Sequence, residues 1–494
     1  MVIGYPRPDT MMPAETFSKG ADFARYQQSR IRQWDEVARW SDRWVGWSGY
    51  YHRRLRDIYR FLVPPGQHIL EIGCGRGDLL AALKPARGVG VDFSPEMISR
   101  ARARYPQLDF LLDDAHTLAV EDTFDVIILS DLVNDLWDVQ SVFEQIQPRT
   151  TARTRLILNF YSRLWEWPLG LAERLNLARP TLHQNWLTVE DVANLLGLAD
   201  FEVIRHWEEL LFPLPVPLLA PFLNRYLVKL PPFHLLALTN FLLVRPRGRP
   251  EPMAPEPLVS VVIPVRNEAG NIPSIFDRVP ELGRGTELVF VEGHSQDRSL
   301  AILEREIAAH PLRPTLLLCQ AGEGKGDAVR LGLAKAGGDM LMILDADLTV
   351  PPEDLRRFYE ALRSGKGEFA NGVRLVYPMG QRAMRLVNLA GNKLFSLAFS
   401  SLLGQPIKDT LCGTKAIWKK DYDLVVADDS HFGEFDPFGD FALLFGAAKL
   451  GLKIVDIPIR YRERTYGTTN INRWKHGWLL LRMVFRAALR IRFV

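Results

Sequence analysis

Short apolar runs alternate with stretches of helical periodicity along most of the chain. Such runs cover residues 68–72, 88–91, 110–112 and 124–129 in the first half, and residues 258–263, 287–291 and 339–344 in the second. Strands that alternate with helices are typical of α/β domains built on a mostly parallel sheet. The pattern therefore predicts an α/β fold in each half. The motifs at the strand ends differ, so the halves do not look like repeats of each other.

A proline-rich stretch separates the two halves. Residues 246–257 hold five prolines in twelve positions and no large aliphatic side chain except Met253. Proline donates no backbone hydrogen bond, so this stretch is expected to form a semi-rigid spacer. The sequence therefore predicts one domain over residues 1–245 and a second over residues 258–494, within the two to four domains that about 100–200 residues each would allow.

The composition describes an ordinary globular protein. Hydrophobic residues make up 47% of the chain and charged residues 24%, which excludes a largely disordered or fibrous protein. The 61 basic and 58 acidic residues leave a net charge of +3, and this balance argues against a dedicated nucleic-acid binder. Three cysteines without a CxxC pair argue against a disulfide framework or a structural zinc site. With no visible signal peptide or run of about 20 apolar residues, we expect a cytoplasmic protein.

A glycine-rich turn follows the first strand. Glu71 opens a run that contains Gly73, Gly75 and Gly77, and a helix is predicted directly beyond it. Glycines at such a turn let a ligand approach the backbone, and the N–H groups of the helix can bind a carboxylate. The next strand ends in Asp92, where a carboxylate suits the two ribose hydroxyls of a nucleoside.

Two further strand ends complete this pattern. Asp114 and Ala115 follow the third strand, and Ser130 and Asp131 follow the fourth. With the E-x-G-x-G-x-G run, they resemble the class I S-adenosylmethionine-dependent methyltransferases over about residues 40–245. The alternative, a nicotinamide-binding Rossmann domain, would use G-x-G-x-x-G and lacks the opening glutamate.

This resemblance implies a Rossmann-like fold with S-adenosylmethionine as cofactor. The implied cofactor-binding residues are Glu71, which opens the motif, Gly73, Gly75 and Gly77 at the methionine end, Asp92 at the ribose, and Asp114 with Ala115 at the adenine.

The methyl acceptor is less clearly marked. Methyl transfer needs in-line positioning and, for a hydroxyl acceptor, a base. Candidates are Tyr51, Asp131, Asn134 and His183, although Tyr51 lies in an aromatic-rich helix that would also cap a cofactor pocket, and His183 lies in a loop. The Asn/Asp-Pro-Pro-aromatic run of base methyltransferases is absent after the fourth strand. This absence disfavours a nucleobase and leaves a sugar, a lipid or another small molecule.

The strand ends of the second half carry a different chemistry. The first strand ends at Pro264 and is followed by Glu268, and the second ends in Glu292. Lys325 opens a helix, and the third strand ends in Asp345-Ala346-Asp347. Two carboxylates two positions apart at a strand end can turn toward one divalent cation that also binds a diphosphate. Such an ion neutralises a nucleotide leaving group as a glycosidic bond breaks.

These strand ends resemble the family 2 glycosyltransferases of the GT-A fold over about residues 257–475, and most closely the polyprenyl-phosphate sugar synthase branch. Supporting runs are residues 371–374, 409–415 and 464–469. The sequence departs from that branch at residues 292–295, which read EGHS in place of DDGS, at Thr349, and at residues 467–470, which lack a lysine.

The resemblance implies a role for several residues, with Mg²⁺ or Mn²⁺ as cofactor. The implied nucleotide-sugar-binding residues are Pro264, Glu268, Glu292, Lys325, Asp345 and Arg374, the metal ligands are Asp345 and Asp347, and the catalytic residues are Asp347, Arg464 and Asp440. Arg374 and Arg464 would clamp an anion, because guanidinium forks match phosphate oxygens. Asp440 would act as a base in an inverting enzyme, but an ionised phosphate acceptor needs none, so it would then orient the acceptor.

Two segments predict contact with a membrane surface. Residues 382–403 are helical in pattern, and residues 478–494 mix leucine and aromatic residues with arginines that recur every four positions. Residues 460–494 carry nine basic residues against one acid, a net charge of +8, which suits an anionic bilayer. The alternative is that both helices pack on the protein. The apolar, proline-rich residues 210–230 are a third candidate contact or a lid.

Together these patterns predict a bifunctional enzyme on the cytoplasmic face of a membrane. One half would transfer a sugar from a nucleotide donor to a polyprenyl phosphate or a growing glycan, and the other would methylate a sugar, a lipid or another small molecule. Such a pair of reactions suits cell-surface glycan biosynthesis. The alternative is a glycosyltransferase with a non-catalytic S-adenosylmethionine-binding or scaffold module.

Overall fold

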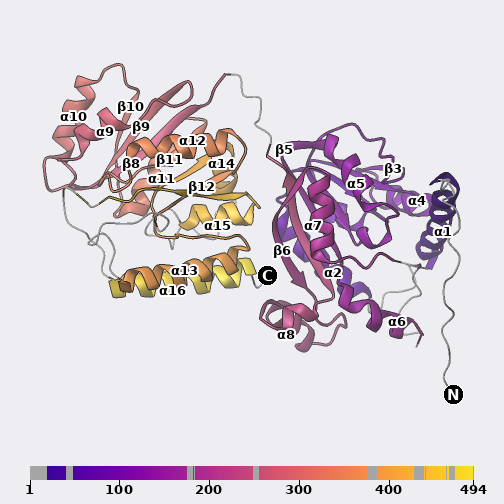
Figure 1. Cartoon of the computed structure of the whole chain (residues 1–494). Helices are drawn as coiled ribbons and strands as arrows, with labels where there is room; N and C mark the ends of the chain where they lie inside the picture. The colour runs from indigo at the N-terminus through magenta and orange to yellow at the C-terminus, as the bar shows by residue number, and fades with distance from the viewer. Residues whose placement is uncertain are drawn as a thin grey trace, which may run out of the picture.

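The chain forms two α/β bodies, one from each half (Figure 1). The computed structural model describes residues 19–40, 48–174, 182, 184–248, 255–374, 386–427, 439, 441–462, 464, 466 and 473–492. Each body is built around its own seven-stranded sheet. The α/β class expected in both halves is therefore confirmed.

The sheet of the first half has the strand order β3-β2-β1-β4-β5-β7-β6. All its neighbouring strands are parallel except β7, which runs antiparallel to both β5 and β6. This order departs from the six-strand order 3-2-1-4-5-6 of dinucleotide-binding domains. The strands, in spatial order, are β3 (Asp109–Leu112), β2 (Arg87–Asp92), β1 (His68–Ile72), β4 (Phe124–Ser130), β5 (Thr150–Tyr161), β7 (Thr239–Pro246) and β6 (Phe201–Glu209).

Helices cover both faces of this sheet, as the central strands require. The buried side chains of β1 and β4 point alternately into two apolar clusters, one shared with α2, α3 and α4 and the other with α5 and α7. Local signals fix several helix starts: Ser94 caps α4 ahead of Pro95, and Thr188 and Asp191 form a capping box on α7. The helices are α1 (Lys19–Trp40), α2 (Ser48–Leu62), α3 (Asp78–Ala82), α4 (Pro95–Arg104), α5 (Val139–Ile146), α6 (Glu166–Arg174), α7 (Val189–Leu198) and α8 (Leu219–Arg225).

The sheet of the second half has the order β10-β9-β8-β11-β13-β12-β14. Strands β10, β9, β8 and β11 are parallel, and β13 runs antiparallel to both β11 and β12. The strands are β10 (Thr315–Cys319), β9 (Gly285–Glu292), β8 (Leu258–Val265), β11 (Met340–Ile343), β13 (Lys415–Trp418), β12 (Phe369–Val373) and β14 (Ile454–Pro458).

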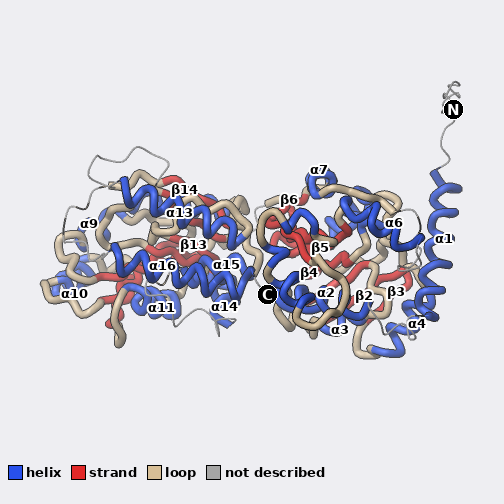
Figure 2. Tube along the Cα trace, turned by 90° about the horizontal axis from the view of Figure 1, so that it is seen from below, coloured by secondary structure: helices blue, strands red, loops and turns tan. Residues whose placement is uncertain are grey.

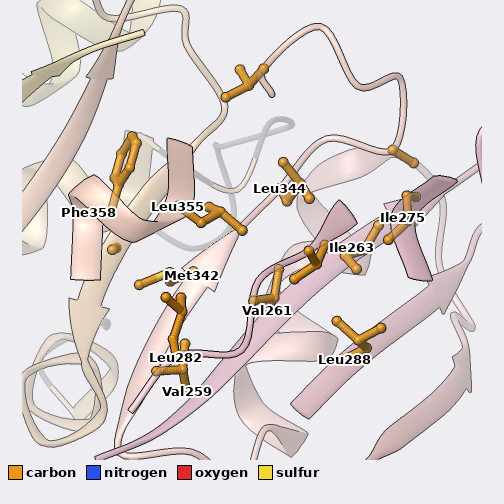
Figure 3. Packing of buried hydrophobic residues seen from close by; sticks show 14 of the residues in the cluster. Val259, Val261, Ile263, Ile275, Leu282, Leu288, Met342, Leu344, Leu355 and Phe358 are labelled. Carbon is orange, nitrogen blue, oxygen red and sulfur yellow. The ribbon is translucent and has the colours of Figure 1, made fainter. Parts of the chain in front are cut away.

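Two apolar clusters lie on opposite faces of this second sheet. On one face, Val261 and Ile263 of β8 pack against Ile275 of α9 and Leu355 and Phe358 of α12 (Figure 3). On the other face, α11, α13, α15 and α16 share the second cluster. The helices are α9 (Ile272–Arg278), α10 (Ser299–Ala309), α11 (Lys325–Lys335), α12 (Leu355–Arg363), α13 (Leu386–Leu403), α14 (Lys419–Ala427), α15 (Phe441–Lys449) and α16 (Arg473–Ala487), which continues as a π-helical turn, η8 (Ala488–Arg492).

A buried ionic cluster joins the two bodies. Arg155 of β5 and Arg245 of β7 both approach the buried carboxylate of Glu368, at 2.7 and 3.5 Å. Arg155 also donates to the Gly451 carbonyl at 2.9 Å. The cluster holds β5 and β7 of the first sheet against the start of β12 in the second, so the two bodies pack against each other.

The segment between the bodies differs in detail from the expected spacer. Pro246 is still part of β7, where it pairs with Phe201, and β8 begins at Leu258. Residues 249–254 lie outside the described part of the chain. In the described residues, we find no helix with the length and the apolar character that crossing a membrane requires.

Candidate functional site

The glycine-rich turn after β1 depends on backbone conformations that only glycine adopts easily. Gly73, Gly75 and Gly77 have φ angles of 75°, 52° and 74°, in the left-handed region that side chains with a Cβ disfavour. A Cβ on Gly77 would lie 2.5 Å from the Phe110 ring, whereas one on Gly75 would meet no atom within 4 Å. Gly77 therefore serves packing, while Gly75 leaves open space beside the backbone.

Two carboxylates hold this turn in place. Buried Glu71 accepts a hydrogen bond from the Leu80 N–H at 3.0 Å, and this bond ties α3 to the strand end. Asp92 accepts from the N–H groups of Gly75 and Ser94, both at 2.9 Å. Burial raises the pKa of Glu71 to about 8 and that of Asp92 to about 6. Both groups therefore hold a proton more tightly than a carboxyl in water.

A cavity that opens to solvent lies at the ends of β1 and β2, with about 410 Å³ of empty space including its open mouth. Four of the predicted cofactor residues line it, namely Gly73, Asp92, Asp114 and Ala115. Glu71, Gly75 and Gly77 are not among its lining residues. They shape the turn beneath it, so the structure divides the predicted set into residues that face the cavity and residues that support them.

Helix α1 forms one wall of this cavity, and no sequence motif predicted that. Gln27 donates to the Asp114 carboxylate at 2.7 Å, and Arg30 pairs with Asp135 at 2.8 Å. Asp35 accepts from the Ser94 hydroxyl at 2.5 Å. These bonds tie α1 to the ends of β2, β3 and β4, so a ligand in the cavity would lie between the sheet edge and α1.

Asp114 is held by groups from both its own loop and α1. It accepts from the His116 N–H at 2.8 Å, contacts His116 Nδ1 at 2.7 Å, and accepts from Gln27. Burial raises the pKa of Asp114, but these contacts, led by His116, outweigh burial and leave the pKa below its ordinary value. Asp114 is thus fixed as an ionised acceptor at the cavity wall.

Two of the predicted acceptor residues meet at the end of β4. The Tyr51 hydroxyl donates to Asp131 at 2.7 Å, and Asn159 donates to the same oxygen at 2.5 Å. Burial raises the pKa of Asp131 to about 7, although the hydrogen bonds from Tyr51 and Asn159 oppose this rise. Asp131 can therefore gain or lose a proton near neutral pH. Asn159 was not among the predicted residues.

The other two candidates do not join this pair. The side chain of Asn134 accepts from the Tyr161 N–H at 2.9 Å and donates to the Asn185 carbonyl at 2.8 Å, so it bridges β5 to a neighbouring loop. His183 lies outside the described residues.

In the second half, the predicted carboxylate pair lies directly after β11. Lys325, at the start of α11, approaches Asp345 at 2.6 Å, and Arg464 approaches Asp347 at 2.5 Å. The Thr349 hydroxyl also donates to Asp347, at 2.8 Å. Each carboxylate therefore has a cationic side chain beside it, one from the start of α11 and the other from the segment after β14.

Glu268 borders the same cluster. Its buried carboxylate accepts from Asn271 at 2.7 Å and lies 3.9 Å from Arg464. Burial raises the pKa of Glu268 to about 7. Gly413 packs directly against this cluster. A Cβ there would lie 2.3 Å from Lys325 Nζ and 2.4 Å from the Asp345 carboxylate, so a larger residue would displace the ion pair.

The remaining predicted residues have different surroundings. Pro264 lies within β8 opposite Val291, and the Glu292 carboxylate accepts from the N–H groups of its own loop, those of His294 at 3.1 Å and Ser295 at 2.6 Å. Burial raises the pKa of Glu292, but the bonds from Ser295 and His294 outweigh burial and lower it overall.

Arg374 is paired within the protein. Its guanidinium spans both oxygens of buried Asp409, at 2.8 and 2.9 Å. The role of Arg374 as an anion clamp stays a prediction, because Nε and Nη2 of its guanidinium both donate to Asp409 here. Asp440 lies outside the described residues.

The carboxylate pair fits the metal chemistry expected of it only in part. Among the described residues, no group of three or more histidine, cysteine or acidic side chains is arranged to hold an ion. Asp345 and Asp347 offer hard oxygen donors, and Mg²⁺ is often bound by one or two carboxylates together with substrate phosphates. The donors present therefore suit an ion that arrives with a diphosphate rather than a cage made by the protein alone.

Comparison with known protein families agrees with the two resemblances. A family model described as a methyltransferase domain matches residues 69–150, and the model of glycosyl transferase family 2 matches residues 260–426.

Two similar proteins are sugar transferases. Undecaprenyl-phosphate 4-deoxy-4-formamido-L-arabinose transferase of Pseudomonas aeruginosa is 36% identical over 119 residues, which cover 23% of this chain and 35% of that protein. Dolichol-phosphate mannosyltransferase of Pyrococcus furiosus is 27% identical over 46% of this chain and 63% of its own length. The chain thus spans about a third of the first of these relatives and less than two thirds of the second.

Among solved structures, the N-methyltransferase NodS of Bradyrhizobium japonicum is 13% identical, with a TM-score of 0.28 over 40% of this chain and 97% of that one. A methyltransferase of Clostridium acetobutylicum is 15% identical, with a TM-score of 0.28 over 41% and 91%. By its two family matches, the chain combines a methyltransferase domain with a glycosyl transferase family 2 domain.

Proposed function

We propose that the chain is a bifunctional transferase. Its second half transfers a sugar from a nucleotide donor to a polyprenyl phosphate, or else to a growing glycan, and its first half transfers a methyl group from S-adenosylmethionine. The observation that carries this proposal is that each half presents its own polar cluster at the carboxyl edge of a separate sheet: Asp92 with Asp114 in one, and Asp345 with Asp347 in the other. Ligands of open α/β sheets bind at this edge.

In the glycosyltransferase half, the reaction would depend mainly on electrostatic stabilisation of the diphosphate. A bound Mg²⁺ or Mn²⁺ would neutralise the diphosphate of the leaving nucleotide. Asp345 and Asp347 would hold that ion, while Lys325 and Arg464 lie where they can turn from the carboxylates to the phosphate oxygens. Pro264, Glu268 and Glu292 would line the nucleotide.

The proposed lipid acceptor rests on the relatives. Their names include undecaprenyl phosphate and dolichol phosphate, and we take this class of lipid phosphate as the acceptor. A phosphate monoester is already ionised at neutral pH, so this acceptor needs no base. In this reaction Asp440 would orient the acceptor, and a sugar hydroxyl in a glycan acceptor would instead need Asp440 as a base.

In the methyltransferase half, the cavity beside Gly73 and Asp92 would take S-adenosylmethionine, with Asp114 at its adenine end. The methyl group would be supplied by this cofactor. Asp131 would accept the proton of an acceptor hydroxyl, because its pKa near 7 suits a base at neutral pH. Tyr51 would hold the Asp131 carboxylate in position.

We further propose that the protein works on the cytoplasmic face of a membrane. Helix α16 supports this location, since Trp478, Leu481 and Phe485 are exposed on the helix while Met483 and Ala487 are buried against the protein. The helix therefore both packs on the domain, as one reading of the sequence expected, and presents apolar groups outward, as the other did.

A donor screen tests the glycosyltransferase half. Release of UDP or GDP from a panel of sugar nucleotides would be measured with and without a polyprenyl phosphate, in the presence of Mg²⁺ or Mn²⁺. We expect one donor to release its nucleotide only when the lipid is present. Release that is independent of any lipid or glycan would contradict acceptor transfer.

A binding measurement tests the methyltransferase half. Calorimetric titration of the full chain with S-adenosylmethionine is expected to show one site, which Asp92→Asn weakens. Labelled methyl transfer into an extract of membrane lipids would then separate an active enzyme from a binding module, since a module binds the cofactor without turnover. A chain that does not bind S-adenosylmethionine contradicts the bifunctional proposal.

A further inference from the structure

Exposed apolar side chains gather in four segments of the chain. Of the 28 large apolar side chains that are exposed among the described residues, 18 lie in residues 163–174, 216–236, 393–403 and 478–492. We call these four segments the apolar face. Exposed leucines scattered singly are normal on soluble proteins, but a contiguous apolar surface marks a site of interaction.

The apolar face extends over both domains. Helices α6 and α8 of the first half and α13 and α16 of the second lie along one edge of the molecule, the lower edge in Figure 1. Seen from that side, α13 and α16 run next to each other (Figure 2). Arg492, just beyond α16, donates to the Lys229 carbonyl at 2.8 Å, so the second domain joins the first within this face.

The most exposed members of the face come from both domains. Trp167 on α6 is 84% exposed, Leu218 before α8 is 88% exposed, and Trp478 on α16 is 73% exposed. On α16 the exposed residues Trp478, Leu481, Phe485 and Leu489 follow a helical spacing, so they form a stripe along the helix. Tryptophan at such a boundary suits the interfacial zone of a bilayer.

The charge of the apolar face identifies its occupant. The four segments carry nine basic and two acidic residues. One of the nine, Lys229, is buried and paired with Glu209, which leaves a net charge of +6 for the face in a chain whose total is +3. A second copy of this chain would bring an equally basic face and be repelled. Apolar groups interleaved with basic groups complement a bilayer that contains anionic lipid. We infer that the methyltransferase domain docks on the membrane together with the glycosyltransferase domain, and that its methyl acceptor is a lipid-linked hydroxyl.

The position of Asp131, which marks the acceptor end of the methyltransferase site, supports a lipid-linked methyl acceptor. Strand β5 ends at Tyr161, whose ring lies 6.1 Å from the Tyr51 ring beside Asp131. The chain then enters α6, and Trp165 donates to the Leu236 carbonyl at 3.0 Å. The acceptor end of the methyltransferase site thus borders two segments of the apolar face. In this inference, a lipid-linked substrate approaches Asp131 from the bilayer.

The transfer balances without a further reactant. As the acceptor oxygen bonds to the methyl carbon, its proton passes to Asp131, and the sulfur–methyl bond breaks with its electron pair left on sulfur. The products are a methyl ether on the lipid-linked molecule and S-adenosylhomocysteine. This part of the inference rests on the proposed methyltransferase activity, whereas the docking surface does not.

Flotation of the full chain with vesicles tests the docking surface. The vesicles would contain phosphatidylcholine with about 30 mol% phosphatidylglycerol, or phosphatidylcholine alone. We expect the Trp167→Ser, Leu171→Ser variant on α6 and the Trp478→Ser, Phe485→Ser variant on α16 each to weaken binding at least about tenfold, since each loses two apolar side chains that the bilayer would bury. A matched control is Leu300→Ser, Leu312→Ser, two exposed leucines outside the apolar face, and it should float like the unmodified chain.

An α6 variant that floats like the unmodified chain, while the α16 variant does not, overturns the docking of the methyltransferase domain. Titration with S-adenosylmethionine shows that the α6 variant is folded, because neither substituted residue lines the cofactor cavity.

Labelled methyl transfer tests the acceptor class. The label should enter the organic phase of a membrane extract, and the α6 variant should lower this incorporation about tenfold while it keeps its cofactor affinity. Label found in water-soluble products overturns a lipid-linked acceptor but leaves the proposed methyltransferase intact. Absence of any transfer by the unmodified chain instead contradicts the proposed activity, and flotation still reports on the surface.

Discussion

Arg464 Nη2 lies 2.5 Å from the Asp347 carboxylate, although the two residues are 117 positions apart. The segment after β14 therefore returns to the turn after β11, and the same guanidinium lies 3.9 Å from Glu268 at the end of β8. One arginine thus connects the ends of two neighbouring strands at the proposed nucleotide-sugar site.

Replacing Arg464 should impair sugar transfer more than folding. Arg464→Ala removes a charge placed to meet the diphosphate, and we expect kcat/KM for nucleotide release to fall about 10²–10³-fold. Arg464→Lys keeps the charge but loses the planar fork, so its effect should be intermediate. Arg284→Ala, which removes a solvent-exposed ion pair with Asp339, is the control and should leave the rate unchanged. Equal rates for Arg464→Ala and the control would contradict the assignment.

The carboxylate pair should determine the metal requirement. Chelation with EDTA is expected to stop sugar transfer, and added Mg²⁺ or Mn²⁺ to restore it. The Asp345→Asn, Asp347→Asn variant should lose at least about 10²-fold in transfer at saturating metal, because it removes both proposed ligands. Asp423→Asn replaces an exposed carboxylate on α14 and serves as the matched control. Full activity of the double variant would show that the ion, if any, binds elsewhere.

Two substitutions in the glycine-rich turn should have different effects, one mainly on folding and the other on cofactor binding. Gly77→Ala combines left-handed strain with overlap on the Phe110 ring, so we expect a loss of about 3 kcal/mol in stability. Gly75→Ala has the strain of about 1–2 kcal/mol alone, but its Cβ enters the space beside the backbone. Its cofactor dissociation constant should rise about tenfold. Thermal unfolding and calorimetric titration of both variants measure the contrast. A Gly75→Ala variant with unchanged cofactor affinity would contradict the predicted role of Gly75 at the methionine end of the cofactor.

The sequence predicted those parts of the fold that local patterns determine. The strands that end in Asp92, Glu292 and Asp345 are short apolar runs that stop at a turn motif, and each lies where it was expected. Strands β6 and β7 were not predicted. Their place depends on antiparallel pairing of β7 with β5, whose residues lie about 80 positions earlier, and no local pattern encodes that pairing.

The site shows the same limit. Residues in motifs, such as Gly73, Asp92 and Asp114, could be named in advance because their spacing along a strand end is informative. Gln27 and Arg30 could not, because their partners are 87 and 105 positions away and α1 carries no motif. Arg374 shows the converse, since its residue type indicated an anion clamp but not its pairing with Asp409.

The junction between the domains should be sensitive to acid. Burial raises the pKa of Glu368, but the charges of Arg155 and Arg245 outweigh burial and hold it below its ordinary value. The ionised carboxylate therefore stabilises the folded chain above the unfolded pKa, and this stabilisation is lost as the pH falls through the folded pKa.

Glu368→Gln should lower stability by about 3 kcal/mol at neutral pH, because it leaves buried Arg155 without its anion. Arg245 keeps its ion pair with Glu202. The substitution should also remove part of the acid sensitivity. Scanning calorimetry from neutral pH down to about pH 4 measures both effects. Glu353→Gln, at an exposed pair with Arg278, is the control, with an expected loss below about 1 kcal/mol. A similar loss for the two variants would show that the junction does not depend on this carboxylate.

The last prediction concerns the proton acceptor of methyl transfer. Only the ionised form of Asp131 can accept a proton, so kcat/KM should rise with pH and level off above a midpoint near 7. The hydrogen bond from Tyr51 favours the ionised form, so Tyr51→Phe should move the midpoint to higher pH, while Asp131→Asn should lower the rate about 10²–10⁴-fold. Tyr50→Phe on the same helix is the matched control, because the Tyr50 hydroxyl contacts Asn224 instead and the midpoint should stay in place. The rate would be measured with labelled S-adenosylmethionine across this pH range. A midpoint that Tyr51→Phe leaves unmoved, or moves downward, would show that another group accepts the proton.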